Sequence, residues 1–297
     1  MKKLRTILTL FLVGLIIQGG IYIYLDRVLL APAADYQLTS TKEQEKMGFG
    51  VEPTGKTYYS HDKQYMAIIG DDKVSIYEAG KKGEPLIMPL KGKEISYFEW
   101  LPDRNLAILG LYGKNAKTDK YEVLMAQYNP QSPDHELDTT LTDVPRGSKI
   151  VDATYSTATN VVYMKLEMEK NVFRIYRTDA NYDTRRIRVQ AENIGHIGVF
   201  YDEDKMFYDN LRTGVVYMFN GDDDSWRIVS PAGGHFRLVG LDGKDIYIAE
   251  LNKNDEVVAA YKGKLKVGFT KIASYQTAVT FDTLSMDKLK SAANGEK

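Results

Sequence analysis

Residues Lys56 to Gly80 read KTYYSHDKQYMAIIGDDKVSIYEAG, and their pattern returns several times before the C-terminus. Aromatic and β-branched residues dominate its apolar runs, and these runs are separated by the polar stretches Ser60–Lys63 and Gly70–Lys73. Such residues favour strands, whereas Asp and Gly favour the tight turns that join them. The stretch therefore predicts a strand, a polar turn, a second strand, a hairpin and a third strand.

The polar turn recurs about every 40 residues. Its equivalent positions are Asp62, Asp103, Ser156, Asp202, Asp242 and Asp282, at intervals of 41, 53, 46, 40 and 40 residues. The longest interval is explained by turn-rich insertions at 113–120, 129–134 and 143–148. A period near 40 residues with about four strands is typical of a β-propeller blade.

Five complete four-strand units can be placed between Thr57 and Ala273, followed by a lone strand at Ala278–Phe281. A circular array of sheets has to close without a long unpaired edge, so we expect this last strand to pair with a strand at Met47–Val51 or to cap the array. The prediction is an all-β fold, a β-propeller of five to six four-stranded blades preceded by one N-terminal transmembrane helix.

Three of the repeats carry a recognisable motif: YSHDKQYMAII, EWLPDRNLAIL and GLDGKDIYIAE. They resemble the W-S-P-D-G-K-x-I-A-F signature of TolB-type, WD40-like propeller repeats. The resemblance covers roughly Lys56 to Met286, but only Pro102-Asp103 keeps the Pro-Asp pair and only Asp242-Gly243 keeps Asp-Gly. It implies a propeller that presents a binding surface, and it implies no particular ligand because such repeats serve many unrelated functions.

The N-terminus predicts a membrane anchor. Lys2, Lys3 and Arg5 precede a run without charged residues from Ile7 to Leu25. A helix over that run is long enough to cross a bilayer, and the basic flank should stay in the cytoplasm, which places the rest of the chain outside the membrane. Two alternatives are a signal peptide cleaved near Ala31-Pro32-Ala33 and a buried core helix.

The chain therefore divides into four expected parts: a basic tip with a signal anchor at 1–30, a linker at 31–54, the propeller at 55–286 and a disordered tail at 287–297. The net charge of −1 lacks the positive excess that phosphate backbones require, so nucleic acid is not an expected partner. The absence of cysteine excludes disulfides, thiolate metal sites and cysteine nucleophiles.

Few residues suggest chemistry. His196 and His235 directly precede the expected innermost strands of adjacent blades and could share one mouth of a central channel, or they could be ordinary polar residues at strand starts. No G-x-S-x-G, S-x-x-K, HExxH or Walker A motif occurs. Asp222–Asp224 could bind calcium, but Asp and Gly are also common in hairpins for backbone reasons. We expect no cofactor, no metal and no catalytic residue.

Two further groups could contact a ligand. Trp100 and Trp226 could form a carbohydrate platform at the channel mouth, although most aromatic residues of a propeller pack between blades. Arg186 and Arg188 could contact an anionic polymer, or they could lie on a solvated outer strand that is charged against edge pairing.

The expected function is that of a membrane-anchored, extracytoplasmic binding or scaffold module without catalysis, with a protein or a cell-envelope polysaccharide as partner. The alternative is a propeller-type hydrolase or lyase whose site lies at the mouth of the central channel.

Overall fold

A computed structural model of the chain describes residues 55–81, 83–90, 92–133 and 137–294, together with the isolated positions 14, 18, 48, 49 and 51. Two compact units are distinguished, Met1–Val51 and Glu52–Lys297. In the first unit Gly14 and Gln18 are helical. The rest of the expected transmembrane helix lies outside the described residues, and among the described residues no helix is long and apolar enough to span a bilayer.

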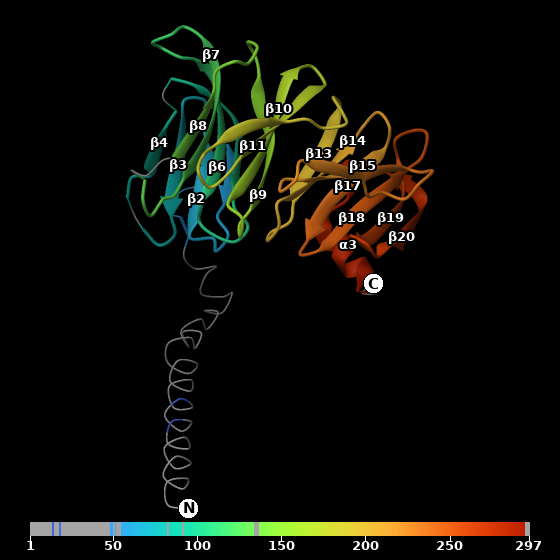
Figure 1. Ribbon diagram of the computed structural model, residues 1–297. Coiled ribbons are helices and arrows are strands. Elements are labelled where there is room, and N and C mark those ends of the chain that lie inside the picture. Colours follow the sequence, from blue (N-terminus) through green and yellow to red (C-terminus); the bar gives the residue numbers. More distant parts are fainter. Residues whose placement is uncertain are drawn as a thin grey trace, which may run out of the picture. The chain divides into compact units, whose positions relative to one another are not determined.

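The second unit contains five antiparallel four-stranded sheets, each built from four consecutive strands in sequence order (Figure 1). The first sheet consists of β1 (Lys56–Tyr59), β2 (Tyr65–Ile69), β3 (Lys73–Glu78) and β4 (Leu86–Pro89). The second consists of β5 (Glu94–Trp100), β6 (Ala107–Lys114), β7 (Tyr121–Tyr128) and β8 (Leu137–Leu141). The third consists of β9 (Lys149–Ser156), β10 (Val161–Glu169), β11 (Val172–Thr178) and β12 (Thr184–Ile187).

The fourth sheet consists of β13 (Ile194–Val199), β14 (Lys205–Asn210), β15 (Val215–Asn220) and β16 (Ser225–Ile228). The fifth consists of β17 (His235–Asp242), β18 (Asp245–Leu251), β19 (Val257–Lys264) and β20 (Gly268–Val279). A 3₁₀ helix, η2 (Phe281–Thr283), and a helix, α3 (Met286–Ala293), follow. The five complete blades predicted from the repeats are therefore present.

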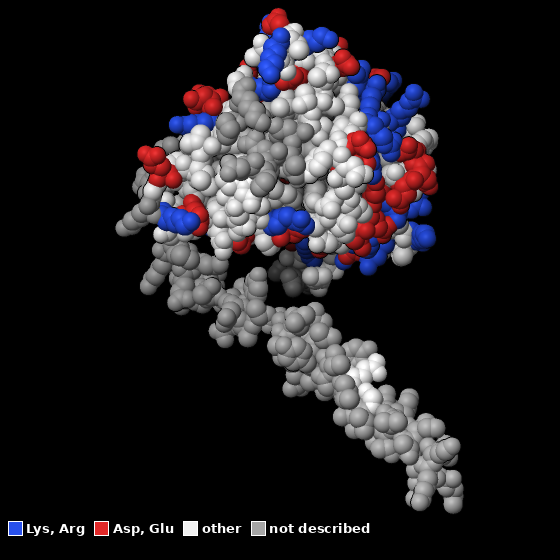
Figure 2. All heavy atoms as spheres, turned by 60° about the vertical axis from the view of Figure 1, so that its left-hand side comes forward, with Lys and Arg blue, Asp and Glu red and all other residues white. Residues whose placement is uncertain are grey.

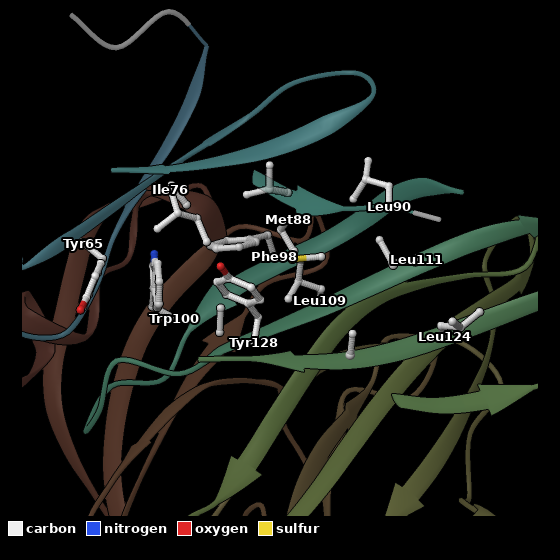
Figure 3. Close-up of a cluster of buried hydrophobic side chains, with 14 residues drawn as sticks. Tyr65, Ile76, Met88, Leu90, Phe98, Trp100, Leu109, Leu111, Leu124 and Tyr128 are labelled. Atoms are coloured by element: carbon white, nitrogen blue, oxygen red, sulfur yellow. The ribbon is translucent and has the colours of Figure 1, made fainter. Parts of the chain in front are cut away.

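The core lies between neighbouring sheets, as expected for blades that pack face to face. Separate hydrophobic clusters join the first sheet to the second, the second to the third, the third to the fourth and the fourth to the fifth. Figure 3 shows the first of these clusters, in which the side chains of both sheets interdigitate. Since burying a large apolar side chain contributes about 1.5–3 kcal/mol, each sheet depends on its neighbours for stability.

The C-terminal region differs from the sequence-based expectation. Ala278 and Val279 do not form a separate strand: they end β20, and Val279 pairs with Val257 of β19. Asp282, expected in a sixth repeat turn, belongs to η2. The described part of the chain thus contains no sixth sheet. The partner strand considered at Met47–Val51 lies mostly outside the described residues, and Gly48 and Phe49 are in neither helix nor strand.

The expected disordered tail is also corrected, because residues 287–293 belong to α3. Ser285 caps this helix by accepting a hydrogen bond from the Lys288 backbone N–H at 3.3 Å. Leu289 is 1% exposed and packs with Tyr247 and Ala260 of the fifth sheet. The helix therefore covers the apolar face of the fifth sheet that has no further blade beside it, which Figure 1 shows at the C-terminus.

Candidate functional site: a polar groove on the inner strands

The first strands of the sheets lie next to one another and line the inner side of the domain. β5 contacts β9, β9 contacts β13, and β13 contacts β17. A hollow of about 560 Å³ is bordered by β1, β2, β5 and β9, and a second of about 540 Å³ is bordered by β9, β10, β11 and β13. Val151 lines both hollows, so we treat them together as the inner groove.

Glu99 and Tyr97 occupy the wall that β5 contributes. They are two residues apart, so their side chains point to the same face of the strand. The Tyr97 hydroxyl donates a hydrogen bond to Oε2 of Glu99 and lies 3.2 Å from the carbonyl oxygen of Ala153. Surrounding protein raises the pKa of Glu99, and the bond from Tyr97 opposes this rise. Within the described part of the chain Glu99 has no ion pair, and its side chain still reaches solvent.

Asp152 and Lys165 lie deeper in the groove. Oδ2 of Asp152 is 3.9 Å from Nζ of Lys165, which is only 11% exposed and donates a hydrogen bond to the Gly195 carbonyl instead. Burial raises the pKa of Asp152 to about 6; the Lys165 charge opposes the rise and the Glu99 charge adds to it. Burial likewise lowers the pKa of Lys165. The inner groove therefore contains two carboxyl groups with raised pKa values, Glu99 and Asp152, and one amine, Lys165, whose charge partly offsets that of Asp152.

Asp209 and Arg237 form a buried ion pair beside this groove. Arg237 Nε donates to Oδ2 of Asp209 at 2.9 Å, while Oδ1 of Asp209 has no hydrogen-bond partner among the described residues. Burial raises the pKa of Asp209, and Arg237 opposes the rise. The carboxylate packs on Gly195, where a Cβ atom would lie 2.3 Å from Oδ2, so only glycine fits there.

His196, one of the sequence-predicted site residues, lies in the inner groove. Its ring packs edge-on against Phe281 with 5.5 Å between ring centroids, and Phe281 also lies 3.9 Å below the Arg237 guanidinium. The side chain is exposed to the groove but protein atoms surround it on several sides, which lowers its pKa; the Asp209 charge opposes this effect. Its imidazole is therefore neutral at neutral pH and can donate or accept a hydrogen bond.

His235 does not join this group. It begins β17 and packs over Gly214 at the β14–β15 turn, where a Cβ atom would lie 2.3 Å from Cδ2 of the ring. The two histidines thus lie in different surroundings. His235 packs against the backbone of a neighbouring turn and does not line the inner groove.

Trp100 is a core residue, contrary to the predicted role as a binding platform. It is 6% exposed and packs between Tyr65 and Phe98, while its Nε1 donates to the Tyr58 carbonyl oxygen at 3.3 Å (Figure 3). Trp226 is 47% exposed but lies on β16, the outermost strand of the fourth sheet. Because Trp100 lies between two sheets and Trp226 lies on an outermost strand, the two rings do not form a common binding platform.

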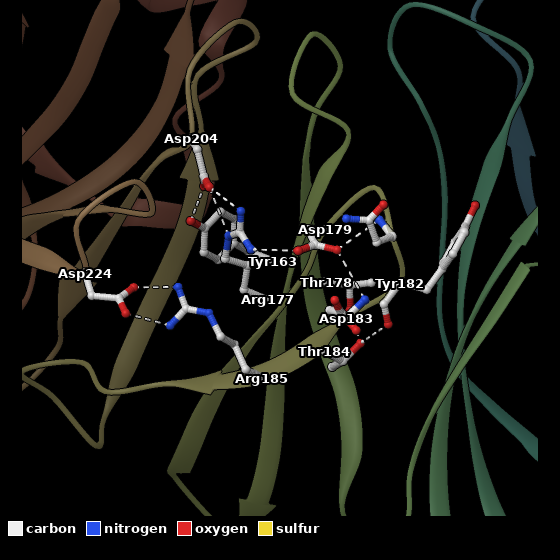
Figure 4. Close-up of polar contacts among 11 residues, drawn as sticks. Tyr163, Arg177, Thr178, Asp179, Tyr182, Asp183, Thr184, Arg185, Asp204 and Asp224 are labelled. Atoms are coloured by element: carbon white, nitrogen blue, oxygen red, sulfur yellow. Dashed lines mark hydrogen bonds and ion pairs between the residues drawn. The ribbon is translucent and has the colours of Figure 1, made fainter.

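Arg186 and Arg188 lie at the outermost strand of the third sheet, where both side chains are exposed. Their neighbour Arg185 pairs with Asp224 of the fourth sheet (Figure 4). This placement matches the interpretation as a solvated outer strand. On the face shown in Figure 2, uncharged residues occupy most of the described surface, and Lys or Arg and Asp or Glu side chains lie near one another at its edges.

Sequence reasoning missed Glu99, Asp152 and Lys165. All three residues lie within expected strands. Each is a charged residue in a strand that is otherwise largely apolar and that belongs to the inner part of a blade, and this pattern could have identified them. Buried charges are rare unless they are paired or functional, so such interruptions favour a site.

Comparisons with known proteins reveal likeness only in structure, since no family model and no curated protein matches the chain. The β-propeller domain of the Trilobed protease from Pyrococcus furiosus aligns over 61% of this chain and 57% of its own, at 14% identity and a TM-score of 0.43. The WD40 repeats of RRP9 align over 72% and 62%, at 11% identity and a TM-score of 0.46.

A putative TolB from Agrobacterium tumefaciens aligns over 76% of this chain and 82% of its own, at 11% identity and a TM-score of 0.47. The chain spans less than two thirds of the length of the protease domain and of the RRP9 structure. The similar structures thus include a putative TolB and a set of WD40 repeats, and likenesses at 11–14% identity with TM-scores of 0.43–0.47 say nothing of this chain's function.

Proposed function

We propose that this protein is a membrane-anchored, extracytoplasmic β-propeller that binds a protein or a cell-envelope polymer and catalyses no reaction. The observation that carries the proposal is the inner groove, where Glu99 and the rings of Tyr58 and Tyr97 line the hollow of about 560 Å³ and Asp152 lines the adjoining hollow. Concave sites that combine aromatic walls with a few polar groups are the usual form of ligand sites. Strands of the first four sheets line the groove and hold these groups in fixed positions.

A photo-crosslinking amino acid at Lys56 tests this function in the full chain and in its own membrane. Lys56 is exposed and borders the hollow, so the probe should capture whatever occupies the groove. The matched control places the same probe at Lys253, which is exposed in the β18–β19 turn. We expect a product from position 56 that is absent from position 253. Equal products at both positions, or none at 56, would contradict a binding role for the groove.

The membrane anchor rests on the charge-free run at Ile7–Leu25 behind Lys2, Lys3 and Arg5. Alkaline phosphatase, which is active only after export, can be fused behind residue 54. We expect an active fusion that stays in the membrane pellet after alkaline carbonate extraction. Active but released protein would indicate the cleaved signal peptide, and an inactive fusion would contradict export.

A second candidate, hydrolysis or elimination at the groove, is favoured by one observation. Asp152 has a pKa of about 6 beside a second carboxyl group with a raised pKa, and a general acid or base works best when its pKa is near the ambient pH. Replacing His196 and His235 together with alanine, and separately Asp152 with asparagine, tests it in cells. If the cellular phenotype and ligand capture both survive these changes, the enzymatic function is excluded.

A further inference from the structure

A second hollow, of about 530 Å³, lies between the fourth and fifth sheets and has a strongly basic lining. We call it the lysine cleft and define it by its positive side chains, which are Lys205, Arg227, Lys244, Lys264 and Lys266. Its only negative lining residues, among those described, are Glu203 and Asp223. This concentration of one sign contrasts with the net charge of −1 of the whole chain.

Two walls bring these cations together. Arg227 lies on β16, where it pairs in register with Met218 and so shares the face of the fourth sheet that packs toward the fifth. Lys264 ends β19, and Lys266 follows in the β19–β20 turn with a positive φ of 69°. The cations therefore converge from two different sheets onto one space.

The carboxylates present do not neutralise this charge. Glu203 is shared by two lysines, Lys205 and Lys244, and Asp202 also pairs with Lys244. Asp223 is held within its own turn by Ser225, whose backbone N–H and hydroxyl donate to Oδ1 at 3.0 and 2.6 Å.

The remaining cations are less well matched. Lys264 and Lys262 both pair with Asp245. Nζ of Lys264 lies 3.4 Å from Oδ1, whereas Nζ of Lys262 lies 2.8 Å from Oδ2. Arg227 and Lys266 have no ion pair within the described residues. Two positive charges on opposite walls are thus available to an anion.

The floor of the cleft strengthens such an interaction. Phe200, Met218 and Leu265 line it, and the Lys244 ammonium lies 4.9 Å from the centroid of the Phe200 ring. Attraction between charges increases as apolar surroundings replace water. Lysines bind phosphate as point charges, and several ammonium groups around one space favour a group of concentrated charge such as phosphate over a single carboxylate.

We propose that the lysine cleft is a second binding site, separate from the inner groove, and that it binds a phosphate-bearing polyanion. The proposal is independent of the function of the inner groove, because none of the cleft residues borders that groove. An anion bound here would contact both the fourth and the fifth sheet.

The test uses the full-length protein in neutral-lipid nanodiscs and a fluorescent short-chain polyphosphate as the probe. The cleft variant is Arg227→Gln with Lys266→Gln. The matched control is Arg186→Gln with Arg188→Gln, which removes the same charge from exposed positions on the third sheet. We expect affinity to fall about tenfold in the cleft variant and to change less than about twofold in the control. Thermal unfolding of both variants checks that they are folded.

Three outcomes would overturn the proposal. Equal losses in both variants would show general surface electrostatics, and a loss in the control alone would place the site on the third sheet. Hexaglutamate that binds as tightly as polyphosphate would remove the preference for phosphate. Inorganic phosphate that competes equally well per phosphate group would show that a single free phosphate, and not a polymer, is bound.

Discussion

Oδ2 of Asp103, in the β5–β6 turn, accepts a hydrogen bond of 2.8 Å from Oγ1 of Thr157, in the β9–β10 turn of the next sheet. Corresponding turns are joined in the same way around the series of sheets: Asn105 donates to Asp62, Ser156 donates to the Tyr201 carbonyl and Lys244 pairs with Asp202. The repeated polar turn therefore links neighbouring blades, which explains why its aspartates recur without a shared chemistry.

Replacing Asp103 with alanine should destabilise the domain by about 1–2 kcal/mol, because the Thr157 hydroxyl loses its partner. The neighbouring pair with Arg104 is exposed and should add little. Urea unfolding followed by circular dichroism measures the effect, with Asp222→Ala in the exposed β15–β16 turn as the control. Equal stability of both variants would show that the turns do not hold the blades together.

Two arginine–aspartate pairs join the third and fourth sheets, and they should differ in energy (Figure 4). In the pair Arg177–Asp204 the side chains are 13% and 5% exposed, and Tyr163 also donates to Asp204. In the pair Arg185–Asp224 they are 44% and 58% exposed. Water screens the second pair, whereas replacing Asp204 leaves a largely buried guanidinium with only Asp179, 3.7 Å away, as an acidic partner among the described residues, and removes the acceptor of the Tyr163 hydroxyl.

We therefore expect Asp204→Ala to lower the free energy of unfolding by about 3–5 kcal/mol and Asp224→Ala by less than about 1 kcal/mol. Thermal and urea unfolding of the two variants provide the comparison. A loss of similar size in both would contradict the difference in burial on which this prediction depends.

The helix α3 should contribute to the stability of the fifth sheet. Leu289→Ala removes a side chain that is 1% exposed, so we expect a loss of about 2–4 kcal/mol. Lys288→Ala, one residue earlier on the exposed side of the helix, should change stability by less than about 0.5 kcal/mol. If both variants unfold at the wild-type urea concentration, the helix does not serve as the cover of this sheet.

The pH dependence of stability should report on Asp152. Its pKa is about 6 in the folded protein and about 4 in an unfolded chain. Between these values the folded state holds a proton that the unfolded state releases, so this group lowers stability as the pH rises through that window.

Asp152→Asn removes this loss. The unfolding free energy of the variant minus that of the wild type should therefore rise by about 2 kcal/mol between about pH 4 and pH 7. Urea unfolding at several pH values measures it. Glu99, Lys165, Glu167 and His196 line the same groove and are present in both proteins, so the part of their titration that does not depend on the Asp152 charge cancels in the difference. A difference that stays constant with pH would show that Asp152 titrates normally.

Much of the fold could be predicted from the repeats, because strand-forming runs and turn residues act locally. A turn was expected at Tyr155–Ala158, where the Pro-Asp and Asp-Gly pairs are missing, and the structure has it two residues later, at 157–160 between β9 and β10. The secondary structure of the C-terminal region could not be predicted from the repeats. Residues 278–279 continue β20 and residues 286–293 form α3 because the fifth sheet offers an apolar face that needs a cover.

The sequence by itself determined the class of fold, the repeat length and the five complete blades, because alternating strands and tight turns are encoded by neighbouring residues. Tertiary structure alone decided which side chains meet. Trp100 was placed between two sheets, and Glu99, Asp152 and Lys165 were brought to one groove from three different strands. Such groups lie more than 50 residues apart at their extremes, and only the packing of blade against blade determines their distance, burial and charge state.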